Sequence, residues 1–142
     1  MTLDDLIQKI ESDAAAHTTS GPSDADELAA LERAVGQALA PALRAFLGRV
    51  GGGIFYGRHE IFGGHRVMIH DIELVPSLRS VAADLGRRQP APPAGWLPFH
   101  RVDGLVHLID AAGAVVSWPP QERHASFEAF LERVILAPGP AS

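Results

Sequence analysis

Histidine is the residue type in this sequence with the widest chemical potential, and seven histidines are present. His59, His65 and His70 lie in one glycine-rich stretch, while His100 and His107 stand in two apolar runs on either side of an Asp-Gly pair. Imidazole is a common zinc ligand, and His100 with His107 forms the best-placed pair for such a site. No His-x-x-x-His or His-Glu-x-x-His spacing occurs. We therefore assign the histidines to strands and turns and predict no metal site.

Groups that would support hydrolysis are not assembled into a recognisable pattern. The chain has no cysteine, which excludes a thiolate nucleophile and cysteine-ligated zinc. It also lacks the Gly-x-Ser-x-Gly motif of a serine nucleophile. Glu60, Asp71 and Glu73 are available for acid–base chemistry, but acids two residues apart on a strand are typical of a solvated face. We predict no catalytic residue and no enzyme, with a metal-dependent hydrolase as an open alternative.

The glycine cluster 51–53 does not have the context of a phosphate-binding loop. It follows a predicted helix and precedes a predicted strand, whereas a phosphate loop leads from a strand into a helix N-terminus. Lys9 is the one lysine of the chain, so a phosphate-loop lysine is also missing. The sequence therefore predicts no nucleotide or other cofactor.

Charge is distributed unevenly along the chain. The whole sequence carries a formal charge of −5, yet residues 1–32 hold eight acids and one lysine, a formal charge of −7. An acidic front argues against direct binding of nucleic acid and is compatible with a basic protein partner. Tyr56 and Trp118, at predicted strand ends, are candidate aromatic anchors for that partner. The alternative for the acids is that they only solvate and cap the helices. The candidate acidic contacts lie on the polar faces of the first two helices: Asp4, Asp5, Glu11, Asp24, Asp26, Glu27 and Glu32.

Capping residues and apolar spacing predict helices at both ends of the chain. Thr2 is a suitable cap for a first helix, Ser23 or Asp24 caps a second that ends at Gly36, and Ser126 caps the last. A third helix runs from Pro41 to Val50, with apolar residues at i, i+3, i+4 and i+7, and a fourth follows Pro76. Residues 14–23 are expected to form a loop or mobile linker, and residues 137–142 a frayed tail.

Strand signals fill the middle of the chain. Short apolar runs occur at residues 54–56, 60–62, 67–74, 99–102, 105–109 and 115–118. The Asp103-Gly104 pair is typical of a type I′ turn, which fixes the hairpin register. That register pairs Val102 with Leu105, Arg101 with Val106, His100 with His107 and Phe99 with Leu108. One α+β domain over residues 1–142 follows, with helices packed on a mainly antiparallel meander sheet.

Several short motifs appear in a characteristic order. The first half contains Val35-Gly36, Leu39-Ala40-Pro41, Arg44-Ala45-Phe46-Leu47 and Gly51-Gly52-Gly53. The second half contains Leu97-Pro98-Phe99, Asp103-Gly104, Leu108-Ile109-Asp110, Gly113, Val115 and Ser126-Phe127 followed by Phe130-Leu131-Glu132. Over residues 24–135 this arrangement resembles the SUKH superfamily, which includes the fungal Smi/Knr cell-wall regulators and many bacterial immunity proteins.

This resemblance implies a binding domain of the Smi/Knr-like fold that uses no cofactor. Its bacterial members neutralise toxins, often nucleases, by binding them, so the resemblance implies an immunity protein with a cognate toxin as partner. A regulatory or adaptor domain that binds another protein is the alternative. The N-terminus lacks the basic, apolar pattern of a secretion signal, and no run approaches a membrane span of about 18 apolar residues. We therefore expect a cytoplasmic protein that does not bind membranes.

Overall fold

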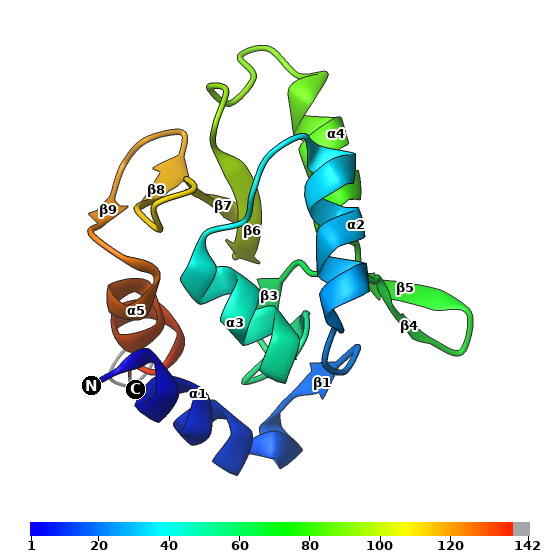
Figure 1. The fold of residues 1–142 in the computed structure, drawn as a ribbon, viewed down its shortest axis with the longest axis vertical. Coiled ribbons are helices and arrows are strands. Elements are labelled where there is room, and N and C mark those ends of the chain that lie inside the picture. The colour runs from blue at the N-terminus through cyan, green and yellow to red at the C-terminus, as the bar shows by residue number, and fades with distance from the viewer. Residues whose placement is uncertain (138–142) are drawn as a thin grey trace.

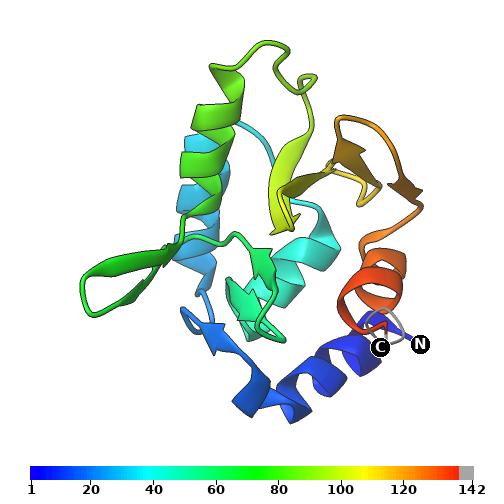
Figure 2. The same cartoon turned by 180° about the vertical axis from the view of Figure 1, so that it is seen from behind.

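The helices of the domain flank a mainly antiparallel sheet, so the predicted α+β class is confirmed (Figures 1 and 2). The computed structural model describes residues 1–137, and most of the expected tail, residues 138–142, lies outside this range. The α-helices are α1 (Leu3–Ser12), α2 (Ala25–Val35), α3 (Pro41–Arg49), α4 (Leu78–Gly86) and α5 (Phe127–Phe130). A π-helical turn, Leu131–Ile135, continues α5.

The main sheet has seven strands in the order β1-β2-β3-β6-β7-β8-β9, all paired antiparallel. These strands are β1 (Thr18–Thr19), β2 (Gly53–Phe55), β3 (His59–Ile61), β6 (Leu97–Val102), β7 (Leu105–Ile109), β8 (Val115–Trp118) and β9 (Arg123–His124). The two remaining strands, β4 (Val67–Ile69) and β5 (Ile72–Val75), form a separate hairpin. In Figure 1 this hairpin projects from the body of the domain beside α2.

The predicted helix caps are confirmed. Thr2 and Asp24 each accept a hydrogen bond from the backbone N–H three residues on, completing capping boxes with Asp5 and Glu27. Gly36 ends α2 in the left-handed conformation. Gly51 follows α3 with φ +88°, a conformation that favours glycine. A Cβ atom at this position would lie 2.0 Å from the carbonyl oxygen of Gly21, so the close approach of the two backbone segments also requires glycine.

The core forms around α3. Leu43, Phe46 and Leu47 are fully buried on the face that the apolar spacing predicts. The Phe46 ring lies edge-on to Phe55 of β2 and Phe127 of α5, with ring centroids 5.5 and 5.8 Å apart. Helix α3 thus joins the first strands of the sheet to the last helix.

Two sequence expectations about strands were wrong. Residues 67–74 form the β4–β5 hairpin rather than one strand, because His70 and Asp71 adopt φ of +50° and +65° and reverse the chain. Phe99 does not pair with Leu108: a bulge in β6 places Pro98 opposite Leu108, while His100 still pairs with His107. Proline lacks the N–H that a regular ladder needs, which favours such an irregularity.

The segment 14–23 is not simply the expected loop or linker. Ala14–Ala16 form a 3₁₀ turn, and Thr18–Thr19 pair with Ile54 and Gly53 as the first strand of the sheet. The backbone N–H of Ser20 also donates to the carbonyl of Gly52 over 2.9 Å. The segment that follows α1 is therefore joined to the sheet by backbone hydrogen bonds.

Candidate functional site

The acids of α1 that were expected to contact a partner are engaged within the chain. Arg49 at the end of α3 donates to Asp4 and, over 2.7 Å, to Glu11. Asp5 accepts the backbone N–H of Thr2 in the capping box, which lowers the pKa of its carboxyl. All three acids are exposed, but their negative charge is matched by Arg49 or used at the helix end.

The acids of α2 show the same behaviour. Asp24 and Glu27 form the capping box, and Glu27 also contacts His65. Glu32 accepts the backbone N–H of Leu39 over 2.8 Å and faces Arg44. Within residues 1–137, Asp26 is the acid of this group without a hydrogen bond or ion pair. The structure therefore offers little free negative charge on either helix.

The two candidate aromatic anchors differ in their surroundings. The Tyr56 hydroxyl donates to Asp13 over 2.7 Å, and the backbone N–H of Tyr56 donates to Nδ1 of His17 over 3.1 Å. Burial and the Asp13 carboxylate raise the pKa of Tyr56. Tyr56 thus links α1 to β2. Trp118 ends β8, half-buried, beside a small cleft of about 100 Å³.

The β4–β5 hairpin, called the arm from here on, carries the exposed large apolar side chains of the described chain apart from Met1. They are Met68, Ile69, Ile72 and Leu74, and Ile72 is 67% exposed. Val67 and Val75, which pair at the base of the arm, are buried in the core. Glu73 lies 3.7 Å from Arg66, which directly precedes β4, and the exposed Asp71 at the turn adds one further negative charge. The arm is thus a nearly neutral apolar projection fixed to the body at its base (Figure 2).

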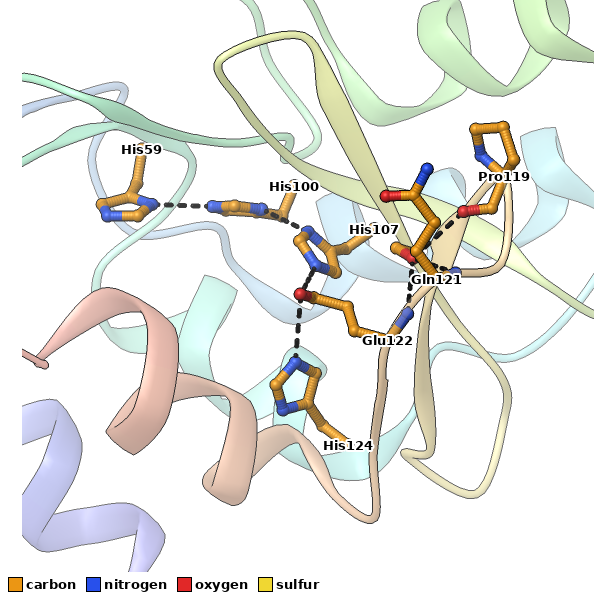
Figure 3. Close-up of polar contacts among 8 residues, drawn as sticks. His59, His100, His107, Pro119, Gln121, Glu122 and His124 are labelled. Carbon is orange, nitrogen blue, oxygen red and sulfur yellow. Dashed lines mark hydrogen bonds and ion pairs between the residues drawn. The ribbon is translucent and has the colours of Figure 1, made fainter.

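A second unusual region runs along the main sheet, where four histidines and one glutamate form a row (Figure 3). Nδ1 of His59 lies 3.0 Å from Nε2 of His100, and Nδ1 of His100 lies 3.1 Å from Nδ1 of His107. Nε2 of His107 lies 2.5 Å from Oε1 of Glu122, which is 3.3 Å from Nε2 of His124. We call His59, His100, His107, Glu122 and His124 the histidine row.

Burial keeps the inner members of the histidine row neutral. It lowers the pKa of His59 to about 4 and places the pKa of His100 well below its usual value. Glu122 is the partner that fixes the tautomers: its pKa is lowered mainly by the hydrogen bond from His107, and a carboxylate can only accept. His107 therefore donates through Nε2–H and accepts at Nδ1 from His100, which in turn accepts at Nε2 from His59.

The histidine row lines a cleft, and Ser117 supports the loop at its end. His59, His107 and Glu122 contribute to the wall of a cleft of about 770 Å³, with charged neighbours that include Lys9 and Arg58. Ser117 fixes the loop that carries Glu122, because its hydroxyl accepts the backbone N–H groups of Gln121 and Glu122.

Sequence reasoning found one part of the row and missed the other. It paired His100 with His107 across the hairpin, and their rings do lie side by side. Glu122 and His124 were not singled out, because they lie 15 and 17 positions beyond His107 without a ligand spacing. Pairing of β7 with β8 places His107 opposite Ser117. A sequence-based alignment of these two strands could therefore have indicated that Glu122 and His124 lie near His107.

Comparison with known proteins gives the family of this chain. A family model described as SMI1-KNR4 cell-wall, of the SUKH group, matches residues 3–136. This chain belongs to that family. The SUKH resemblance expected from the short motifs is thereby confirmed.

A solved structure of a protein from Pseudomonas syringae pv. tomato has the same fold as the SUKH domain described here. Its TM-score is 0.70 at 20% identity, over 94% of this chain and 98% of that one. At this identity the likeness supports the fold alone. No curated protein matches the sequence. Within residues 1–137, no helix has both the length and the apolar character that crossing a membrane requires.

Proposed function

We propose that this SUKH domain is a non-enzymatic, cytoplasmic immunity protein that neutralises a cognate toxin by stoichiometric binding. Family membership supports a binding role, and the immunity role is what the resemblance to bacterial SUKH proteins implies. The observation that carries the proposal is the arm, which exposes Met68, Ile69, Ile72 and Leu74 on one projection. Clustered exposed apolar side chains are typical of protein–protein contacts.

The chemistry of the arm defines the toxin surface that it would bind. Arg66 pairs with Glu73, and Asp71 at the turn is the one acid of the arm without a partner among the described residues, so electrostatic attraction would contribute little and the complementary surface is a mainly apolar cleft. Strands β4 and β5 pair with each other and, among the described residues, with no further strand. Each therefore has a free backbone edge to which an extended toxin segment can add as a third strand.

The arm replaces the acidic helix faces as the proposed interface. Asp4, Glu11 and Glu32 face arginines of this chain, which reduce the negative potential that these acids present to a basic toxin. Asp26 is an acid without such a partner in the described chain, and it serves as the matched control. Nuclease toxins remain a class that the resemblance implies, bound through an apolar surface rather than through the nucleic-acid cleft.

Co-expression with the product of the neighbouring gene tests the proposal. We expect the wild-type chain to restore growth and to co-purify with the toxin in a 1:1 complex. Ile72→Asp, and Ile69→Asp in a second variant, should abolish both, because each places a charge in an apolar contact. Asp26→Lys should leave growth and complex formation unchanged, and circular dichroism should show that all variants are folded.

The other outcomes separate the remaining functions. Rescue that survives both arm substitutions but fails in Asp26→Lys would move the interface to the acidic face of α2. Failure of the wild-type chain to rescue growth against any neighbouring gene product would overturn the immunity role and favour the regulatory or adaptor function. Hydrolysis by the isolated chain would instead favour the enzyme alternative.

A further inference from the structure

We infer that the end of the histidine row is a site for a divalent transition-metal ion, with zinc as the best-matched ion. His107, Glu122 and His124 each offer a ligand atom, and these three atoms lie within 4.8 Å of one another. Two imidazole nitrogens and one carboxylate are a donor set that zinc accepts, with a fourth position left for water or another ligand. This inference is independent of toxin binding by the arm.

The two distances that involve Glu122 fit the ion after a small movement of its side chain. Ligand atoms around a tetrahedral zinc ion lie roughly 3.3 Å apart. Nε2 of His124 is 3.3 Å from Oε1 of Glu122, whereas Nε2 of His107 is 2.5 Å from the same oxygen. Glu122 must therefore withdraw by less than about 1 Å from His107. It can do so, because its side chain is 44% exposed and stands on the loop between β8 and β9.

His124 is held only weakly by the described residues. Its side chain is 9% exposed, its contact to Glu122 is long, and its Nδ1 atom is buried without a hydrogen-bond partner among the described residues. With Nε2 as the ligand atom, Nδ1 of a neutral His124 would carry the proton, so the unpaired Nδ1 indicates a water or another acceptor beside the ring and not the ion itself. A buried imidazole with one weak contact is thus available for coordination.

The surroundings match those of protein metal sites. Nδ1 of His107 contacts Nδ1 of His100, whose Nε2 contacts His59, so a ligand histidine has the outer partner that fixes its orientation. The ring of Phe130 packs against His107 and His124, with centroids 5.0 and 5.5 Å away, and forms an apolar wall. On the other side, His107 and Glu122 line the 770 Å³ cleft, which leaves the fourth position accessible.

Coordination would reverse the hydrogen bonds of the histidine row without charging it. Nε2 of His107 would give its lone pair to the metal, so its proton would move to Nδ1 and be donated to His100. His100 would then donate from Nε2 to Nδ1 of His59, whose proton would stand on Nε2. Each imidazole stays neutral before and after. Because the row is already hydrogen-bonded, the chain is expected to fold without the ion; the inferred site departs from the sequence analysis, which predicted no metal site.

Isothermal titration calorimetry tests the site. The untagged full chain is treated with a chelator and then titrated with Zn²⁺. We expect saturable binding of one ion per chain, and Mg²⁺ should not compete because it prefers oxygen ligands. Glu122→Gln keeps an acceptor for His107 but removes the carboxylate, and should weaken Zn²⁺ binding at least about tenfold. Glu27→Gln changes the exposed His65–Glu27 pair in the same way and should leave the affinity unchanged.

Absorption spectra with Co²⁺ as a probe provide a second readout. The wild-type chain and Glu27→Gln should give the intense visible bands of a four-coordinate ion, and Glu122→Gln and His124→Gln should not. Absence of saturable Zn²⁺ binding would overturn the inference. So would equal affinity in Glu122→Gln and the wild type, because the ion would then be held by other histidines. If His124→Gln does not fold, the exposed Glu122 variant still decides the question.

Discussion

The arm and the histidine row depart from the usual distribution of residues in opposite directions. Ile72 of the arm is 67% exposed, whereas the side chain of His107 is 1% exposed. Apolar side chains are normally buried and titratable ones normally solvated, so both regions need a physical reason. In the row the reason is internal, because each imidazole has a neighbour to bond. In the arm the proposed reason is external: none of the described residues covers the apolar surface, and a partner would.

This contrast separates two kinds of functional region. The histidine row lies within the sheet and is built into the core by Phe130, which contacts three of its imidazoles. The arm is joined to the core at its base by Val67 and Val75 and is otherwise solvated. Changes in the row are therefore expected to alter stability, and changes in the arm to alter binding.

Phe130→Ala is the substitution expected to have the largest effect on stability. The ring is fully buried and packs against Phe99 as well as His100, His107 and His124. Its loss should reduce the free energy of unfolding by about 3–5 kcal/mol. Urea denaturation followed by tryptophan fluorescence measures this. A loss below about 1 kcal/mol would show that the row is not part of the core.

Acidification is expected to destabilise the row more than the rest of the molecule. The pKa of His59 is lowered to about 4, chiefly by burial and next by Arg58, against an ordinary value of 6.5. Between these values the unfolded chain binds more protons than the folded one, so stability is full above pH 6.5 and falls as the pH drops towards 4. A loss of about 1–2 kcal/mol from this group is expected between pH 7 and 5.

Urea titrations at the two pH values, in buffer with a chelator, check the expected loss. His59→Asn should reduce the dependence on pH, because its amide N–H can replace Nδ1–H towards His100 but does not titrate. His65→Asn, which changes an exposed histidine, should leave the dependence unchanged. Equal slopes in the wild type and His59→Asn would contradict the assignment to His59.

Most of the fold could be predicted, because its determinants are local in sequence. Thr2, Asp24 and Gly36 act through hydrogen bonds and backbone conformations within a few residues, and the Asp103-Gly104 turn set the register around His100. The bulge at Pro98 and Phe99 and the turn at His70 and Asp71 carry no glycine signal. They arise because non-glycine residues adopt strained conformations or because the ladder is interrupted, which propensity alone does not reveal.

The candidate sites were less predictable, for different reasons. Two of the five residues of the histidine row are Glu122 and His124. They approach His107 through the pairing of β7, β8 and β9 rather than through spacing in the sequence. The arm was predicted as one strand, because Ile69, Ile72 and Leu74 have residue types that favour strands and no glycine marks the turn. Formal charge also does not reveal that Arg49 pairs with Asp4 and Glu11, whose role as partner contacts stays a prediction.

Tyr56→Phe tests whether this aromatic residue is structural or a partner anchor. The substitution removes the hydroxyl that donates to Asp13 and leaves the ring against His17. Loss of one such hydrogen bond should cost about 1 kcal/mol in thermal or urea unfolding. Toxin binding by the folded protein should not change. A normal stability with a weakened complex would restore Tyr56 as an anchor.

Ile72→Ser should have the smallest effect on stability and so sharpens the contrast most. Because Ile72 is already solvated, replacing it should change the free energy of unfolding by no more than about 0.5 kcal/mol. Ile61 of β3 is a matched control: it is a strand isoleucine with no exposed surface, and Ile61→Ser should cost at least about 2 kcal/mol. Urea denaturation of both variants, measured beside toxin binding, gives the comparison.

If Ile72→Ser destabilised the chain as much as Ile61→Ser, the arm would be packed on the body and its apolar surface would not be available to a partner. If Ile72→Ser instead kept full stability and lost the complex, the exposed apolar surface would be explained by binding.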